Sequence, residues 1–170
     1  MATRYGLQTW FPEALEEFNT VTVFDLLIDY IREGRIRLDN QRINERAAYH
    51  DPCNYGRRAQ KRFGHGYFEE PRWIMDQCLD DWVDLTPNRL YQTCCGGGGG
   101  ALTSGYNDER IFYGRRKMDQ VRDAGASMLV LPCHSCHGQI NNIKSTYGLE
   151  DLKVKYLWEL VADVLIIAPQ

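Results

Sequence analysis

The spacing of apolar residues along the chain predicts helices that alternate with short strands. Apolar side chains three and four residues apart predict a helix over residues 22–33, which Gly34 is placed to end. Similar patterns predict further helices at residues 68–79, 108–124, 139–146 and 159–165. Apolar runs bounded by turn residues predict strands at residues 47–50, 89–93, 127–131 and 154–157. This alternation is typical of an α/β fold with a parallel sheet of about four strands and right-handed crossover helices.

Within the helix at residues 108–124, four apolar side chains are expected to face the core: Ile111, Phe112, Met118 and Val121. Pro12 predicts a short helix that begins after Phe11, and the charged residues 35–45 predict a surface connection. We therefore expect an N-terminal helical segment over residues 1–45, which resembles the tail of a missing upstream region. Residues 46–170 are expected to form a cysteine-rich domain.

Composition narrows the classes of function. The chain has 170 residues, of which 44% are hydrophobic and 25% charged, as in ordinary globular domains. Its net charge of -3 argues against a nucleic-acid partner, because nucleic-acid binders are usually basic. Neither a membrane-spanning run nor a signal-peptide pattern is present in the sequence. We therefore expect a cytoplasmic protein that does not itself insert into a membrane and whose cysteines stay reduced.

Five of the six cysteines follow the ends of predicted strands: Cys53, Cys94, Cys95, Cys133 and Cys136. Because the carboxyl ends of parallel strands share one edge of a sheet, these five side chains are expected to converge there. Cys78 lies within a predicted helix and is expected to be a small buried apolar residue.

Five thiolates exceed the four ligands of a tetrahedral zinc site, and soft thiolate clusters favour iron–sulfur centres. The glycine run begins directly after Cys95, so Gly96 and Gly97 are expected to bring backbone N–H groups close to an anionic centre. A thioredoxin-like pair or a haem attachment site at Cys133 and Cys136 would leave the other three cysteines without a role. A zinc-stabilised binding module remains an alternative.

Histidines and basic residues lie close to these cysteines in the sequence. The four histidines are His50, His65, His134 and His137. His134 and His137, beside the last two cysteines, are the first candidates for a proton source. Four basic residues follow Cys53: Arg57, Arg58, Lys61 and Arg62. They are placed either to attract an acidic partner or substrate or to form a solvated helix face.

Three motifs together resemble the cysteine-rich CCG domain: His50-Asp-Pro-Cys53, Cys94-Cys95-Gly96-Gly-Gly and Pro132-Cys133-x-x-Cys136. That domain occurs in the B and D polypeptides of heterodisulfide reductase and in related iron–sulfur oxidoreductases, and the resemblance runs from about Tyr49 to Leu160. Other stretches are similar to the catalytic iron–sulfur subunit (DsrK-like) of the Dsr electron-transfer complex of dissimilatory sulfur metabolism: Cys53-Asn-Tyr-Gly-Arg57, Phe63-Gly-His-Gly-Tyr-Phe-Glu-Glu70, Pro132-Cys-His-Ser-Cys-His-Gly138 and Lys155-Tyr-Leu-Trp-Glu159.

The resemblance implies that all five cysteines hold a non-cubane [4Fe–4S] cluster, which aerobic preparation is expected to remove. It implies an oxidoreductase that cleaves or forms a disulfide or trisulfide of a small sulfur-carrier protein with C-terminal cysteines. Cys53, Cys94 and Cys95 would then serve catalysis together with His134 or His137. Unlike the family's catalytic subunits, this chain has no ferredoxin-like region with Cys-x-x-Cys-x-x-Cys runs.

Electrons would therefore pass to or from other iron–sulfur or membrane subunits, at the cytoplasmic face of a membrane complex. An electron-transfer module of a flavin-linked glycolate or lactate oxidation system is the alternative among enzymes.

Overall fold

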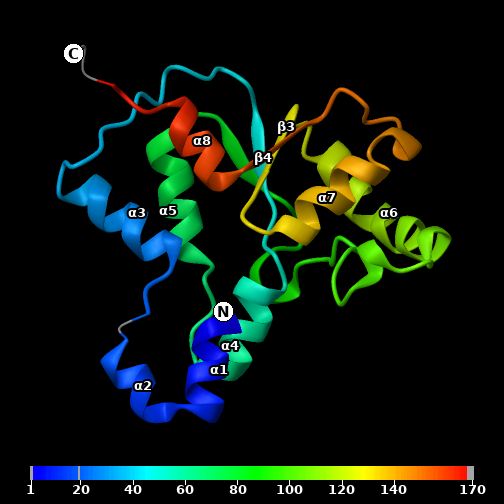
Figure 1. Ribbon diagram of the computed structural model, residues 1–170. Coiled ribbons are helices and arrows are strands. Elements are labelled where there is room, and N and C mark those ends of the chain that lie inside the picture. The colour runs from blue at the N-terminus through cyan, green and yellow to red at the C-terminus, as the bar shows by residue number, and fades with distance from the viewer. Residues whose placement is uncertain (1, 19, 168–170) are drawn as a thin grey trace.

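A computed structural model describes residues 2–18 and 20–167, and it has the predicted α/β fold (Figure 1). Four parallel strands form one sheet in the order β2-β1-β3-β4. The strands are β1 (Ala47–Tyr49), β2 (Trp82–Asp84), β3 (Met128–Leu131) and β4 (Lys153–Tyr156). In the register of the sheet, Leu129 of β3 lies between Ala48 and Val154. The central position of β1 and β3 explains why their sequences are apolar without interruption.

Helices cover both faces of the sheet (Figure 1). The helices α3 (Val23–Arg32), α5 (Glu69–Cys78) and α8 (Leu157–Asp163) share one core, and α6 (Asn107–Asp123) and α7 (His134–Ile143) share the other. Successive side chains of β3 point to opposite faces. Met128 and Val130 therefore join the first core, whereas Leu129 and Leu131 join the second.

The N-terminal part of the chain forms three helices: α1 (Ala2–Trp10), α2 (Pro12–Glu17) and α3. Pro12 occupies the first turn of α2, as predicted. A capping box of Thr22 and Asp25 starts α3, and Gly34 follows its end in the left-handed region with φ 69°. Phe24 is fully buried in the core that α3 shares with α5. The division of the chain at residue 45 stays a prediction.

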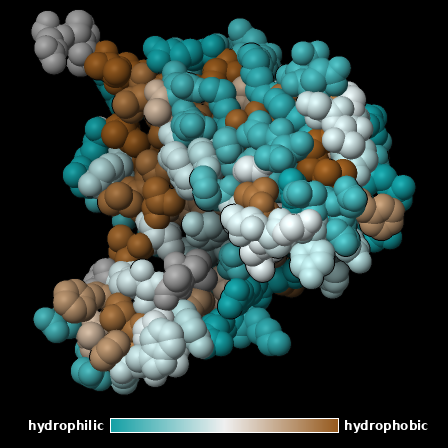
Figure 2. All heavy atoms as spheres, turned by 45° about the vertical axis from the view of Figure 1, so that its right-hand side comes forward, coloured by the Kyte–Doolittle hydropathy of each residue, from teal (hydrophilic) through white to brown (hydrophobic). Residues whose placement is uncertain are grey.

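Apolar side chains remain exposed along these N-terminal helices, and Figure 2 shows hydrophobic residues gathered on that side of the molecule. The exposed side chains there include Trp10, Phe11, Phe18, Val21 and Leu26. The helix α1 is held against α4 (Ala59–Phe63) by two cation–π contacts, of Arg4 with Phe63 and of Arg62 with Tyr5. Among the described residues, no helix has both the length and the apolar character needed to cross a membrane.

The prediction of a strand at residues 89–93 is wrong. The second strand is β2, and residues 89–91 form a 3₁₀ turn instead. The backbone N–H of Arg89 donates to Asp51 at 2.8 Å and so is not available to a strand partner. Leu90 and Tyr91 are 46% and 81% exposed, so their apolar pattern did not mark burial.

Two other expectations need correction. The helix predicted at residues 139–146 starts earlier, because α7 begins at His134, directly after Cys133. In α6, Phe112 is 62% exposed although Met118 and Val121 are buried as expected. Phe112 lies two residues from the buried Gly114, which is about 200° around the helix. Phe112 therefore lies on the exposed face of α6, although it is apolar.

Candidate metal centre

Three loops at the carboxyl edge of the sheet bring the five predicted cysteines together. Cys53 follows β1 and leads into a π-helical turn at residues 54–58, a conformation that is frequent at functional sites. Cys133 caps α7, and Cys136 lies in the first turn of that helix. The remaining pair, Cys94 and Cys95, follows β2 after the 3₁₀ turn. Although the second strand was misplaced, the loop after it returns this pair to the same edge.

The five side chains form a continuous series of sulfur contacts. Cys53 is next to Cys94, Cys94 to Cys95, Cys95 to Cys136 and Cys136 to Cys133, and each of these thiols shifts the pKa of its neighbour. The Cys95 and Cys136 Sγ atoms are 3.2 Å apart. Cys95 and Cys136 are buried, Cys53 and Cys133 are half-buried, and Cys94 is exposed. The site therefore runs from the protein interior to solvent. Cys78 is fully buried in α5, as expected.

The glycine loop supplies backbone donors to two of these sulfurs. The N–H of Gly96 donates to Cys94 Sγ at 3.4 Å, and the N–H of Gly97 donates to Cys95. Gly96 has a φ of 88°, which a residue with a side chain rarely adopts. Hydrogen bonds from the Cys53 and Cys95 thiols, together with the Gly96 donor, lower the pKa of Cys94 to about 2. The chain therefore favours the thiolate, the form that binds metals.

The N-terminus of α7 has the same effect on Cys133. A hydrogen bond from the Cys136 thiol and backbone N–H groups of Cys136 and Ser135 lower the pKa of Cys133 to about 6. The positive end of the helix dipole also favours a thiolate here. Cys94 and Cys133 are thus the two thiols that the chain itself favours as thiolates, whereas hydrogen bonds to neighbouring sulfurs and burial raise the pKa of Cys53, Cys95 and Cys136.

Replacing Gly97 by alanine is expected to weaken metal binding. An added Cβ would lie 2.5 Å from Gln139 Cβ and 2.9 Å from Ser135 O, so it would push the loop of Cys95 away from α7. We expect Gly97→Ala to lower cluster affinity about tenfold or more. Gly98→Ala is the matched control, because no atom lies within 4 Å of a Cβ at that position. Iron retained during a chelator challenge measures the effect, and equal retention in both variants would contradict it.

The histidines occupy different environments. His50, rather than His134 or His137, contacts the sulfurs: its Nε2 is 3.4 Å from Cys136 Sγ, its side chain is buried, and its Nδ1 has no partner among the described residues. A ring nitrogen of His50 and the Sγ atoms of Cys95 and Cys136 lie within 4.8 Å of one another. The position of His50 directly after β1 was the available sequence signal for this contact.

His134 and His137 instead belong to an aromatic group on the surface beside Cys133. The Nδ1 atom of His134 is 2.6 Å from the hydroxyl of Tyr156, and the ring of His137 stacks on Tyr156 at 4.2 Å. His134 and Cys133 both line a cavity of about 380 Å³. His65 pairs with Glu70 at 2.5 Å.

A second cavity, of about 510 Å³, opens at the exposed end of the sulfur series and is lined by Cys53, Cys94, Gly96, Arg57, Arg58 and Lys61. Arg58 lines both openings. No ion pair between described residues involves Arg57, Arg58 or Lys61. The approach to the sulfurs is therefore positively charged.

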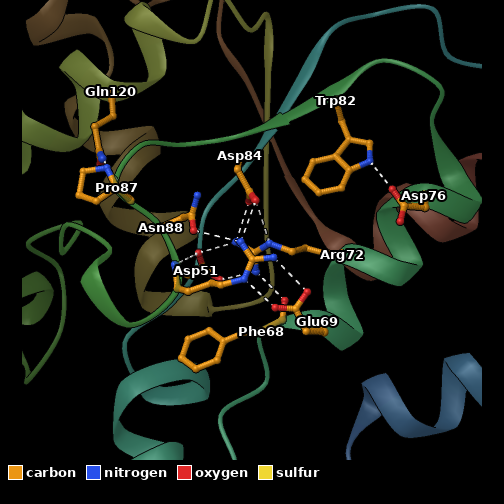
Figure 3. A network of polar contacts seen from close by, with 11 residues as sticks. Asp51, Phe68, Glu69, Arg72, Asp76, Trp82, Asp84, Pro87, Asn88 and Gln120 are labelled. Carbon is orange, nitrogen blue, oxygen red and sulfur yellow. Dashed lines mark hydrogen bonds and ion pairs between the residues drawn. The ribbon is translucent and has the colours of Figure 1, made fainter.

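An arginine clamp holds two of the cysteine loops together (Figure 3). The guanidinium of Arg72 makes two hydrogen bonds to Asp51, at 2.9 and 2.8 Å, and two to Asp84, at 3.0 and 2.6 Å. Asp51 also accepts the N–H of Arg89. The clamp thus connects the loop of Cys53 with β2 and with the segment that leads to Cys94.

The comparison with protein families agrees with this geometry. The profile of the family described as "CCG: Cysteine-rich domain" matches residues 47–141. The chain belongs to the CCG cysteine-rich domain family. The family identified from the sequence is confirmed, whereas the narrower similarity to the Dsr catalytic subunit stays a prediction.

The curated relatives of this CCG domain chain are named as redox proteins. It is 27% identical to the D polypeptide of dihydromethanophenazine:CoB–CoM heterodisulfide reductase from Methanosarcina barkeri, over 87% of this chain and 34% of the relative. It is 32% identical to a probable membrane-anchored ferredoxin of Chromohalobacter salexigens, over 82% and 20%. It is 30% identical to Hdr-like menaquinol oxidoreductase iron-sulfur subunit 2 of Archaeoglobus fulgidus, over 69% and 21%. The chain thus spans about a third or less of the length of these relatives.

The residues at the site fit an iron–sulfur cluster. All five donors are sulfurs, which suits iron–sulfur chemistry, and backbone N–H groups point at three of them. A closed tetrahedral zinc site would leave one thiolate of the five over.

Proposed function

We propose that this CCG domain is an iron–sulfur oxidoreductase module that cleaves or forms a sulfur–sulfur bond. In this proposal Cys53, Cys94, Cys95, Cys133 and Cys136 hold a non-cubane [4Fe–4S] cluster. The observation that carries the proposal is the unbroken series of five sulfurs, open to solvent at Cys94 and supplied with backbone donors. When bound, the cluster supplies or takes up single electrons beside the sulfur substrate.

The chain's own residues account for the remaining requirements. Reductive cleavage of a disulfide takes two electrons and two protons and yields two thiols. In this proposal His134 holds a proton at the cavity that it lines with Cys133, and its hydrogen bond to Tyr156 orients the ring. Arg57, Arg58 and Lys61 would attract a negatively charged substrate segment to the other opening.

We propose a disulfide or trisulfide of a small sulfur-carrier protein as the substrate. The name of the heterodisulfide reductase relatives supports sulfur chemistry, and the sequence similarity to the Dsr catalytic subunit supports a protein carrier. Electrons would pass through other iron–sulfur or membrane subunits, at the cytoplasmic face of a membrane complex. The names of the menaquinol oxidoreductase and ferredoxin relatives support such partners.

The first test is the amount of iron, zinc and acid-labile sulfide per chain in protein prepared without oxygen. About four irons and four sulfides are expected. One zinc without sulfide, also after reconstitution with iron and sulfide, would instead indicate a structural zinc site.

A second test concerns the substrate. Synthetic peptide disulfides and trisulfides that copy the C-terminal arm of a carrier are expected to change the electron paramagnetic resonance spectrum of the cluster. An unchanged spectrum would favour a module that only transfers electrons, as in the glycolate or lactate systems. The similarity to ferredoxin and menaquinol oxidoreductase relatives favours electron transfer as the second candidate function.

The basic rim predicts that the charge of a reagent controls its access to the sulfurs. In the reduced, iron-free protein, the anionic disulfide dithiobis-nitrobenzoate is expected to react severalfold more slowly at high salt than at low salt. The neutral disulfide dithiodipyridine should show little salt dependence. The double variant Arg58→Glu, Lys61→Glu should remove the salt effect, and its control is Arg115→Glu, Arg116→Glu on the exposed face of α6. A salt effect that survives the first variant would contradict the prediction.

A further inference from the structure

Lys117 is a buried lysine of α6, and the described residues offer it no carboxylate partner. Its side chain is 1% exposed. None of the ion pairs or hydrogen bonds between described residues involves its ammonium group. A lysine is almost never buried to this degree unless an anion pairs with it, because burying an isolated charge is costly. The question is therefore which anion compensates this ammonium group.

The packing of α6 places Lys117 behind the sulfurs. Gly114, one turn before Lys117 on the same buried face, lies against the cysteine loop. A Cβ on Gly114 would be 3.3 Å from Cys95 O. Burial lowers the pKa of the ammonium group, and the acidic groups that oppose this are, in order of effect, Cys95, Asp51, Cys136 and Cys94.

Asp51 is already engaged elsewhere. Its Oδ1 and Oδ2 atoms accept hydrogen bonds from the Arg72 guanidinium at 2.9 and 2.8 Å, and Oδ2 also accepts the N–H of Arg89 at 2.8 Å. Its negative charge is thus compensated by Arg72. The sulfurs of Cys94, Cys95 and Cys136, which carry negative charge as thiolate ligands of a metal, are the groups that remain for Lys117.

We propose that Lys117 is the buried countercharge of the sulfur site and that it raises the reduction potential of the cluster held there. This inference rests on the proposed function. A [4Fe–4S] core with five thiolate ligands carries net negative charge, and each added electron increases it. A cation in the low-dielectric interior beside the sulfurs stabilises the reduced form more than the oxidised one. Lys117 therefore acts on the reduction potential through its charge, without being a ligand of the cluster.

The test compares Lys117→Met, Lys117→Arg and a control, Lys144→Met, in the reconstituted protein. Lys144 is a half-buried lysine whose ammonium group donates to Leu152 O at 2.7 Å. Redox titration followed by electron paramagnetic resonance is expected to show that Lys117→Met disfavours reduction at least tenfold, which is about 59 mV for a one-electron step. Lys117→Arg and Lys144→Met should stay within about twofold of the unmodified protein.

The melting temperature of the iron-free protein separates a countercharge from a lysine that only stabilises the fold. Without the cluster, Lys117→Met removes a buried charge, so its melting temperature should equal or exceed that of the unmodified chain. A variant that loses the cluster but still melts no lower also supports the proposal, provided that Lys117→Arg keeps the cluster.

Three results would overturn the proposal. An unchanged potential in loaded Lys117→Met removes the countercharge role and leaves the proposed function intact. A large fall in melting temperature of the iron-free variant shows that the lysine serves folding. Unmodified protein that takes up neither iron nor sulfide overturns the proposed function, and this inference with it.

Discussion

Replacing Cys95 by serine is expected to reduce bound iron from about four per chain to less than about one. Cys95 is buried and lies in the middle of the sulfur series, in contact with both Cys94 and Cys136. A serine hydroxyl is a harder and shorter ligand than a thiolate, so it cannot complete a site built from soft donors. Cys94→Ser should have the same result. Iron and sulfide analysis after anaerobic reconstitution measures both variants.

Cys78→Ala is the control for these variants. Cys78 is fully buried in α5 and lies in the core on the other face of the sheet from Cys95. Its replacement should cost about 1 kcal/mol of stability, as small core truncations do, and leave iron content unchanged. Full iron occupancy in the Cys94 and Cys95 variants would withdraw the cluster site as proposed.

Replacing Arg72 by methionine should destabilise the iron-free protein by about 3–5 kcal/mol. The side chains of Arg72 and Asp51 are only 6% and 2% exposed, so the variant leaves a carboxylate buried without its countercharge. Urea denaturation of the reduced, iron-free chain measures the loss apart from any cluster. Because the clamp connects the Cys53 loop with the segment before Cys94, the variant should also reconstitute less iron.

An exposed ion pair supplies the comparison for this effect. Arg46 and Asp81 are 2.8 Å apart, and both side chains are about half exposed. Arg46→Met should cost no more than about 1 kcal/mol, the ordinary limit for exposed pairs. Adding Asp51→Asn to Arg72→Met should recover part of the loss, since it removes the uncompensated charge. If Arg72→Met and Arg46→Met cost the same, the clamp does not hold the loops as argued.

The predictable parts of the fold are the strands whose burial produces a continuous apolar run in the local sequence. The strands β1 and β3 lie in the middle of the sheet, so helices cover both of their faces and every residue is buried. Their apolar runs follow directly from that position. The strand β2 lies at an edge, its three residues are all half-buried, and it contains Asp84. Its apolar run is limited to Trp82 and Val83, and the longer run at residues 89–93 fits the pattern of a strand better.

The site divides in a similar way. Its five cysteines could be found from their spacing, because a parallel sheet returns the carboxyl end of every strand to one edge. His50 also follows a strand and could have been found in the same way, whereas the burial of Lys117 beside the site could not. Lys117 lies in a helix with many charged residues, where a lysine ordinarily faces solvent.

The sequence by itself determined the α/β class, the family and the cysteines that meet at the sheet edge. The alternation of strands and helices and the chemistry of the thiols depend on residue types and spacings that can be read along the chain. Only the tertiary structure decided which charged groups are buried near those cysteines. Arg72 and Lys117 are buried because distant segments fold over them, and such long-range packing leaves no local pattern in the sequence.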